Sequence, residues 1–317
     1  MSFYVGTGST IQIGKETTFG TAATMTDLVN FTSESLNVSV EKSDEGSLLA
    51  SKTATTRDLM AINVGGSISF ILRPEFAGLL FHAALGGDDT VASAGTGLYS
   101  HTIPLADVDD NLPSLTVTVD RKAACKAYPG CTISSLSLDC AAGDYVKGSF
   151  DISGHSETSG TLASLSAYSV PSYRCTSATF TFGGNSFDIS NCSINLDNAL
   201  EAAPRTYASG LYAGQPQHGQ RNVTVSFEIP YSSAIETLKS TYLTTETNAA
   251  AVLTFASSNS DYTCTITIPN VAITSVENNV SGAGVITANV SGEALSVGSA
   301  EPITVVIVDE NSDAYGE

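Results

Sequence analysis

The sequence has few positive charges and no long hydrophobic run. Its 317 residues contain 13 Lys and Arg against 32 Asp and Glu, a formal net charge of -19 at pH 7. Such a chain repels polyanions, so tight binding of nucleic acid is not expected. The longest strongly apolar stretch, ITVVIV at 303–308, is too short for a membrane helix, and no secretory signal opens the chain. We therefore expect a globular protein that is made in a cytoplasm and does not enter a membrane.

Patterns typical of metal binding and of nucleophilic catalysis are also missing. The cysteines show no CxxC spacing and have no histidine nearby, the four histidines are scattered, and no GxSxG motif occurs. We expect reduced thiols that act as small core residues, although the sequence does not decide whether any of them pair. The six are Cys125, Cys131, Cys140, Cys175, Cys192 and Cys264.

Two short stretches imitate ligand-binding loops without completing them. IQIGKETTFGT, residues 11–21, resembles a phosphate-binding loop, but five residues separate Gly8 from Gly14, and Glu16 stands where a hydroxyl is needed. DVDDN, residues 107–111, begins like a calcium loop but lacks the following glycine and the closing glutamate. We predict no cofactor, no metal and no enzymatic activity, and interpret the acidic stretch as a solvated loop.

Alternation of apolar and polar residues recurs along the chain and indicates half-buried antiparallel strands. In VTVSFEIP, for example, Val225, Phe227 and Ile229 alternate with polar residues. Only two stretches fit helices, at residues 74–85 and 232–243. The sequence predicts an all-β fold with minor α.

The two predicted helices occupy matching places in an internal repeat. Asn37 aligns with Asn195 at an offset of 158 (195 − 37), and Phe70 with Phe227 at an offset of 157 (227 − 70). Each half then continues into its helix. Element type and order repeat, which favours two copies of one β domain over chance similarity between strand-rich segments.

Further along, the offset falls because the linker after the first helix is the longer one. Ile133 aligns with Ile273 at an offset of 140 (273 − 133), and Gly154 with Gly292. The predicted organisation is a first β domain over residues 1–154, a Ser-rich linker over 155–172, a second β domain over 173–298, and a C-terminal strand with an acidic tail over 299–317.

An ordered series of segments resembles the major tail tube proteins of long-tailed (siphovirus-type) bacteriophages. The series is IGKETTFGT, ESLNVSVEKSDEG, the segment around Arg57, VGGSISFILRPEFAGLLFHAALGG and PGCTISSLSLDCAAGDYVKGSFDISG, over about residues 10–154. Gly14, Gly20 and Thr21 match the amino-terminal pattern, whereas the six cysteines are not part of it. The second half follows the resemblance more faintly, through the repeat.

The resemblance implies β-sandwich domains, each with one flanking helix, whose strands join an intersubunit barrel. Six such domains close a ring, and stacked rings form a tube that carries phage DNA. It also implies a virion protein assembled in the host cytoplasm. Its expected partners are itself, a tape measure protein in the lumen, and tail terminator and distal tail proteins at the ends, with DNA only in transit. Because this chain carries two predicted domains, we expect trimeric rings with pseudo-sixfold symmetry; the alternative is a hexamer in which one half lies outside the barrel.

Two groups of residues become candidates for the site. The polar strand faces contain almost no Lys or Arg, which suits a channel wall. The long connections at 41–61 and 198–221, read as loops, carry apolar and aromatic residues that suit contacts between subunits or rings, or else fold back on their own domain. The lumen-facing candidates are Asn37, Ser39, Glu41, Asn195, Asp197, Thr224, Ser226 and Glu228. The candidates for the assembly interface are Leu48, Leu49, Arg57, Leu59, Tyr207, Leu211 and Tyr212.

Other functions stay open at this stage. A two-domain β-sandwich could serve as a binding or adhesion protein at a virion or cell surface. Isolated sandwiches protect their strand edges, whereas tube subunits should expose edges for pairing. A glycosidase or protease is disfavoured because no paired carboxylates and no nucleophile with its base are visible.

Overall fold

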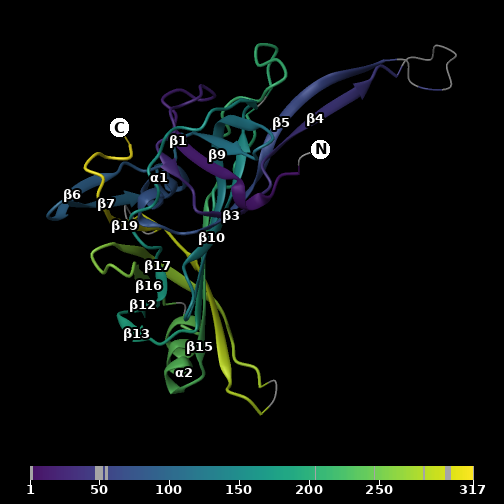
Figure 1. Ribbon diagram of the computed structural model, residues 1–317. Coiled ribbons are helices and arrows are strands. Elements are labelled where there is room, and N and C mark those ends of the chain that lie inside the picture. The colour runs from purple at the N-terminus through teal and green to yellow at the C-terminus, as the bar shows by residue number, and fades with distance from the viewer. Residues whose placement is uncertain are drawn as a thin grey trace.

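The computed structural model describes residues 3–46, 53, 56–203, 205–245, 247–280, 283–296 and 301–316. Strands dominate these residues, so the chain is all-β with minor α, as the alternation predicts (Figure 1). The first half contains β1 (Thr10–Lys15), β2 (Asp27–Leu28), β3 (Phe31–Glu34), β4 (Asn37–Asp44), β5 (Arg57–Ile71), β6 (Thr90–Gly95), β7 (Leu98–Pro104), β8 (Leu115–Asp120), β9 (Cys125–Ala141), β10 (Lys147–Gly154) and β11 (Thr158–Ser159). The second half contains β12 (Arg174–Phe182), β13 (Asn185–Phe187), β14 (Asn191–Asp197), β15 (Asn222–Pro230), β16 (Ala249–Ala256), β17 (Thr263–Glu277), β18 (Thr287–Ala294) and β19 (Thr304–Asp309).

Both predicted helices are confirmed. The helix α1 (Pro74–Leu85) begins with a proline at its first position, where no backbone donor is needed, and all its residues except Glu75 are buried. It contacts β2, β7, β9 and β19, because a helix that is apolar all round needs cover all round. The second helix is shorter: α2 (Ser233–Leu238) continues into a π-helical turn, η2 (Lys239–Leu243), and a 3-10 turn, η1 (Gly6–Gly8), precedes β1.

The two halves repeat one order of antiparallel pairing. In the first half the neighbours run β4–β5–β10–β9–β8–β1, and in the second β14–β15–β18–β17–β16–β12. One helix follows β5 and the other follows β15. This order supports two copies of one β unit, while the proposed domain boundaries stay a prediction.

Two β-bulges refine the alignment of the halves. Ile133 on β9 and Ile273 on β17 each lie directly beside a bulge, and they pair with Ile152 and Gly292. The offset of 140 is therefore confirmed for these strands. The counterpart of Gly292 is Ile152, and the alignment with Gly154 is wrong, because hydrogen-bonded partners set the register and a matching glycine two positions away does not.

The same register determines how β5 aligns with β15. Gly65 and Thr224 pair with the residues that directly follow Ile152 and Gly292, so they are counterparts at an offset of 159 (224 − 65), and the offset of 157 is wrong. Their partners on the other side are Asn37 on β4 and Asn195 on β14. The alignment of Asn37 with Asn195 at an offset of 158 is thereby confirmed.

Strand pairing makes the two halves continuous. The outer edge of β9 pairs with β14, and buried side chains of both halves form one hydrophobic cluster, from Ile11 to Ile307. Figure 1 shows the β4–β5 hairpin projecting from one end of the molecule, and β15 and α2 at the opposite end. The C-terminal strand β19 lies between β7 and β17, so it also ties the halves together.

The structure corrects the reading of two connections and adds contacts to a third. Segment 41–61 was expected to be a loop, but its described ends belong to β4 and β5, because Glu41 and the residues after it pair across the hairpin. The long linker at 86–112 contains the β6–β7 hairpin, which β19 extends. The Ser-rich linker at 155–172 is anchored: Glu75 accepts the Ser169 and Val170 N–H groups at 2.9 and 2.7 Å.

Candidate functional site

Eight strands form one continuous sheet with two different faces. Their order is β4–β5–β10–β9–β14–β15–β18–β17. The face toward the core carries buried residues such as Leu136 on β9 and Leu196 on β14. Their neighbours in the chain, Ser137 and Asn195, point to the opposite face. Between the β-bulges, alternation along these strands separates a mostly hydrophobic face from a mostly polar one.

The polar face is rich in acids. All eight lumen-facing candidates, at positions 37, 39, 41, 195, 197, 224, 226 and 228, lie on it by strand alternation and cross-strand pairing. Its acidic side chains include Glu41, Asp139, Asp151, Asp197, Glu228, Glu277 and Glu293. Two basic groups also lie here: Lys147, which is paired with Asp144, and Arg205, whose guanidinium donates to Asn63 at 2.6 Å. Acids thus outnumber bases on this face, although that it lines a channel remains a prediction.

Both ends of this sheet are open in the described residues. At one end β4 pairs with β5 and with no further described strand. At the other end β17 pairs with β18 along Ser275 to Glu277, while its opposite edge is paired only further back, with β16 from Thr263 to Val271. Val38 and Val276 are half-buried at these two ends, and Val40 is exposed. Open edges with apolar side chains are hazards unless a partner covers them.

The candidates for the assembly interface fall into three situations. Leu48 and Leu49 lie outside the described residues. Arg57 and Leu59 lie on the projecting part of β5, where Arg57 forms an ion pair with Asp44 at 2.7 Å.

The remaining three belong to the connection at 198–221, which is largely irregular. Tyr207 is fully exposed. Leu211 accepts the Ile62 N–H at 2.9 Å, and the ring of Tyr212 lies 5.2 Å from that of His155. Leu211 and Tyr212 thus contact their own chain, the alternative named above, while Tyr207 has most of its surface free for a partner.

Glu16, in the stretch that imitates a phosphate loop, is a buried structural acceptor. Its carboxylate accepts the Ser114 hydroxyl and the Thr116 hydroxyl at 2.7 Å each, and the backbone N–H groups of Gly20 and Gly130 at 2.9 and 2.8 Å. Four donors from three segments satisfy one buried charge, as buried carboxylates require. From the sequence alone, Glu16 is only a residue that is incompatible with a nucleotide-binding loop.

Local backbone geometry explains why glycines lie around Glu16. A Cβ on Gly14 would lie 2.2 Å from the Thr24 carbonyl oxygen, so only glycine lets the two backbones pass. Gly130 has a φ of 72°, in the left-handed region, and this turns its N–H toward Glu16. The family-like amino-terminal pattern thus encodes a turn that closes around a buried carboxylate.

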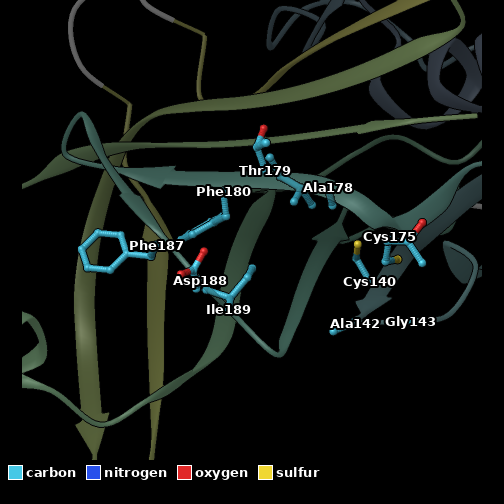
Figure 2. Close-up of a pocket in the computed structure, with 12 residues that line it drawn as sticks. Cys140, Ala142, Gly143, Cys175, Ala178, Thr179, Phe180, Phe187, Asp188 and Ile189 are labelled. Atoms are coloured by element: carbon cyan, nitrogen blue, oxygen red, sulfur yellow. The ribbon is translucent and has the colours of Figure 1, made fainter. Parts of the chain in front are cut away.

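A hollow of about 360 Å³ lies at the joint between the halves. Figure 2 shows Cys140 and Cys175 side by side at one end of it, with Phe180, Phe187 and Ile189 at the other. The hydrogen bond with Cys140, together with burial, raises the pKa of the Cys175 thiol, and burial raises the pKa of Cys192 to about 12. Raised pKa values disfavour, for Cys175 and Cys192, the thiolate form that a catalytic cysteine needs.

His101 forms a buried polar cluster with the C-terminal segment. Its Nδ1 lies 2.6 Å from Asp89 and its Nε2 lies 3.2 Å from Asp309, while the Tyr315 hydroxyl donates to Asp309 at 2.7 Å. Burial acts to lower the pKa of His101, but the hydrogen bond with Asp89 and the charge of Asp309 outweigh it and raise that pKa. No sequence signal pointed to this cluster, because its members lie up to 226 residues apart in the chain.

All six cysteines lie in the described residues and are free thiols, and all but Cys125 are buried. Within the described part of the chain, no group of three or more His, Cys, Asp or Glu side chains is placed to hold a metal ion. Nor does any described helix have the length and apolar character needed to cross a membrane.

Comparisons with known proteins agree with the resemblance seen in the sequence. A search of curated proteins finds no significant match. The family model described as phage tail tube protein matches residues 6–294, nearly the whole chain and both of its halves. That family is a family of structural virion proteins and not of enzymes. This chain belongs to the phage tail tube protein family.

Proposed function

We propose that the chain is the major tail tube subunit and that it polymerises into stacked rings, which form the channel for phage DNA. The observation that carries the proposal is the eight-stranded sheet. It has one face on the core, one exposed and acid-rich face, and an open edge at each end. Such a sheet has the properties of one segment of a closed barrel, since closure would remove both edges.

The acid-rich face suits passage of DNA. Each lysine or arginine on a channel wall could pair with a phosphate and release counterions, which would add affinity and retard the polymer. Carboxylates and hydroxyls offer no such contact. The exposed face of the sheet therefore becomes the channel wall, with DNA only in transit and the tape measure protein in the lumen before ejection.

The repeated order of strands supports three chains per ring. Each chain contributes two four-stranded units, so three chains would supply the six units of a pseudo-sixfold ring. The β4–β5 hairpin, which projects from the body, and the exposed Tyr207 are then placed for contacts with neighbouring subunits or rings (Figure 1). Tail terminator and distal tail proteins would cap the ends of a tube that is assembled in the host cytoplasm.

Electron microscopy of the purified protein tests this function. We expect tubes or rings with a central pore and threefold symmetry in the reconstruction. Six full chains per ring, or a second half without strands in the inner barrel, would overturn the trimer. Dispersed particles without a pore would favour the other function, a two-domain binding or adhesion protein at a virion or cell surface.

A further inference from the structure

The joint between the two halves is an internal example of sheet extension. On β9, the stretch from Ser135 to Ala141 pairs antiparallel with β14, from Asn191 to Asp197. Leu136 and Leu196 face each other there and are both buried. The last strand of one unit thus accepts the first strand of the next unit along its outer edge.

The counterparts of these two strands are the open ends of the sheet. By the register established above, β17 is the counterpart of β9 at an offset of 140, and β4 is the counterpart of β14 at an offset of 158. Val276 and Val38 correspond to the buried Leu136 and Leu196, yet both are half-buried. Side chains that are covered at the internal joint lack part of that cover at the two ends of the sheet.

We propose that β4 of one chain pairs antiparallel with β17 of the next copy, in the register of the internal joint. This inference rests on the ring proposed above. The offsets of 140 and 158 carry the pairs of the internal joint over to the two ends of the sheet. They place Ser39 opposite Ser275, Val38 opposite Val276, and Asn37 opposite Glu277. The junction between chains then repeats the junction within the chain, and the polar and apolar faces of the sheet continue across it.

The chemistry of these pairs suits a second copy of this chain. The two valines restore an apolar cross-strand pair, and the two serines can hydrogen-bond to each other. Glu277 would face the Asn37 amide, so no acid lies directly opposite another acid although the chain is strongly acidic. Each copy carries one β4 edge and one β17 edge, and a head-to-tail contact of this kind closes into a ring when the rotation fits.

Cysteine pairs test the register. The in-register variant carries Ser39→Cys and Ser275→Cys. Its matched control carries Ser39→Cys and Glu277→Cys, which are two residues out of register and about 7–8 Å apart between Cα atoms, too far for a ready disulfide. Each assembly is oxidised with a copper–phenanthroline complex and run on a non-reducing gel, beside the wild type and the single variants, which report on the six native thiols.

We expect the in-register variant to form a ladder of covalent dimers and trimers, with at least about tenfold more cross-linked chain than its control. Electron microscopy of the same samples separates this inference from the function on which it rests. Rings that form normally but give no ladder, or an equal ladder in the control, overturn the pairing alone. Protein that never assembles overturns the ring together with the pairing.

Discussion

Glu16 offers a direct test of how the amino-terminal pattern of this family acts. Its carboxylate is buried and accepts four hydrogen bonds, from the hydroxyls of Ser114 and Thr116 and from the N–H groups of Gly20 and Gly130. Replacement by glutamine keeps the shape but puts an NH₂ group in place of one oxygen. Two of the four donors then face another donor.

The size of the loss follows from these contacts. A buried donor left without an acceptor costs about 1–3 kcal/mol, and hydrogen bonds to charged groups lie at the upper end. A serine hydroxyl can rotate and accept from the amide, so we expect Glu16→Gln to lower the free energy of unfolding by about 2 kcal/mol. Glu16→Ala removes every acceptor and leaves a cavity, and we expect a loss of about 4 kcal/mol.

Urea unfolding followed by far-UV circular dichroism measures both losses, because the chain has no tryptophan for fluorescence. The matched controls are Glu293→Gln and Glu293→Ala, at an exposed glutamate on β18, where we expect changes within about 0.5 kcal/mol. If Glu16→Ala were no more destabilising than its control, the interpretation of Glu16 as a buried anchor would be wrong. A loss for alanine but none for glutamine would show that shape, and not the pattern of acceptors, matters at this position.

Three further predictions concern the channel, the histidine cluster and the C-terminal strand. Lysine at Asn195, Thr224 and Ser226 together should slow DNA ejection in a dye-release assay and leave tube assembly intact, with the rate recovering at higher salt; a predominantly basic pore in a reconstruction would contradict the reasoning. Because the pKa of His101 is raised in the folded protein, its stabilisation is complete below the unfolded pKa of about 6.5 and is lost as pH rises through the folded pKa. The unfolding free energy of the wild type should therefore exceed that of His101→Gln by more at about pH 5.5 than at about pH 8.5, and an equal difference at both would refute the assignment. Amide exchange across residues 303–308 should be slow in the assembled particle, since β19 pairs on both sides, and fast exchange there would count against this placement.

The periodic parts of the fold could be predicted from the sequence. Strand alternation as in Val225, Phe227 and Ile229 depends only on which side chains avoid water, so it is written locally. The helix at 74–85 is apolar all round, and its length is fixed by a proline at the start and a glycine after the end. The alignment of Asn37 with Asn195 at an offset of 158 is correct for a similar reason, since corresponding strands have the same alternation.

Register and contacts between distant segments could be decided only by the tertiary structure. The alignment of β5 with β15 was wrong by two residues, because hydrogen-bonded partners and bulges set register while residue types on one face repeat every second position. The outer part of the β4–β5 hairpin, within 41–61, is read as a loop from the sequence because its strands gain stability from each other and lack the clear alternation of the inner part.

The buried polar anchors were invisible for a more general reason. Glu16 meets Gly130 and His101 meets Asp309 only after the chain has folded, and a lone acid or histidine in a sequence gives no sign of its future partner. The sequence by itself determined that the strongly alternating stretches form strands, that their order repeats and that acids outnumber bases. The tertiary structure decided which strands end the sheet, because an edge exists only once every other strand has found its neighbour.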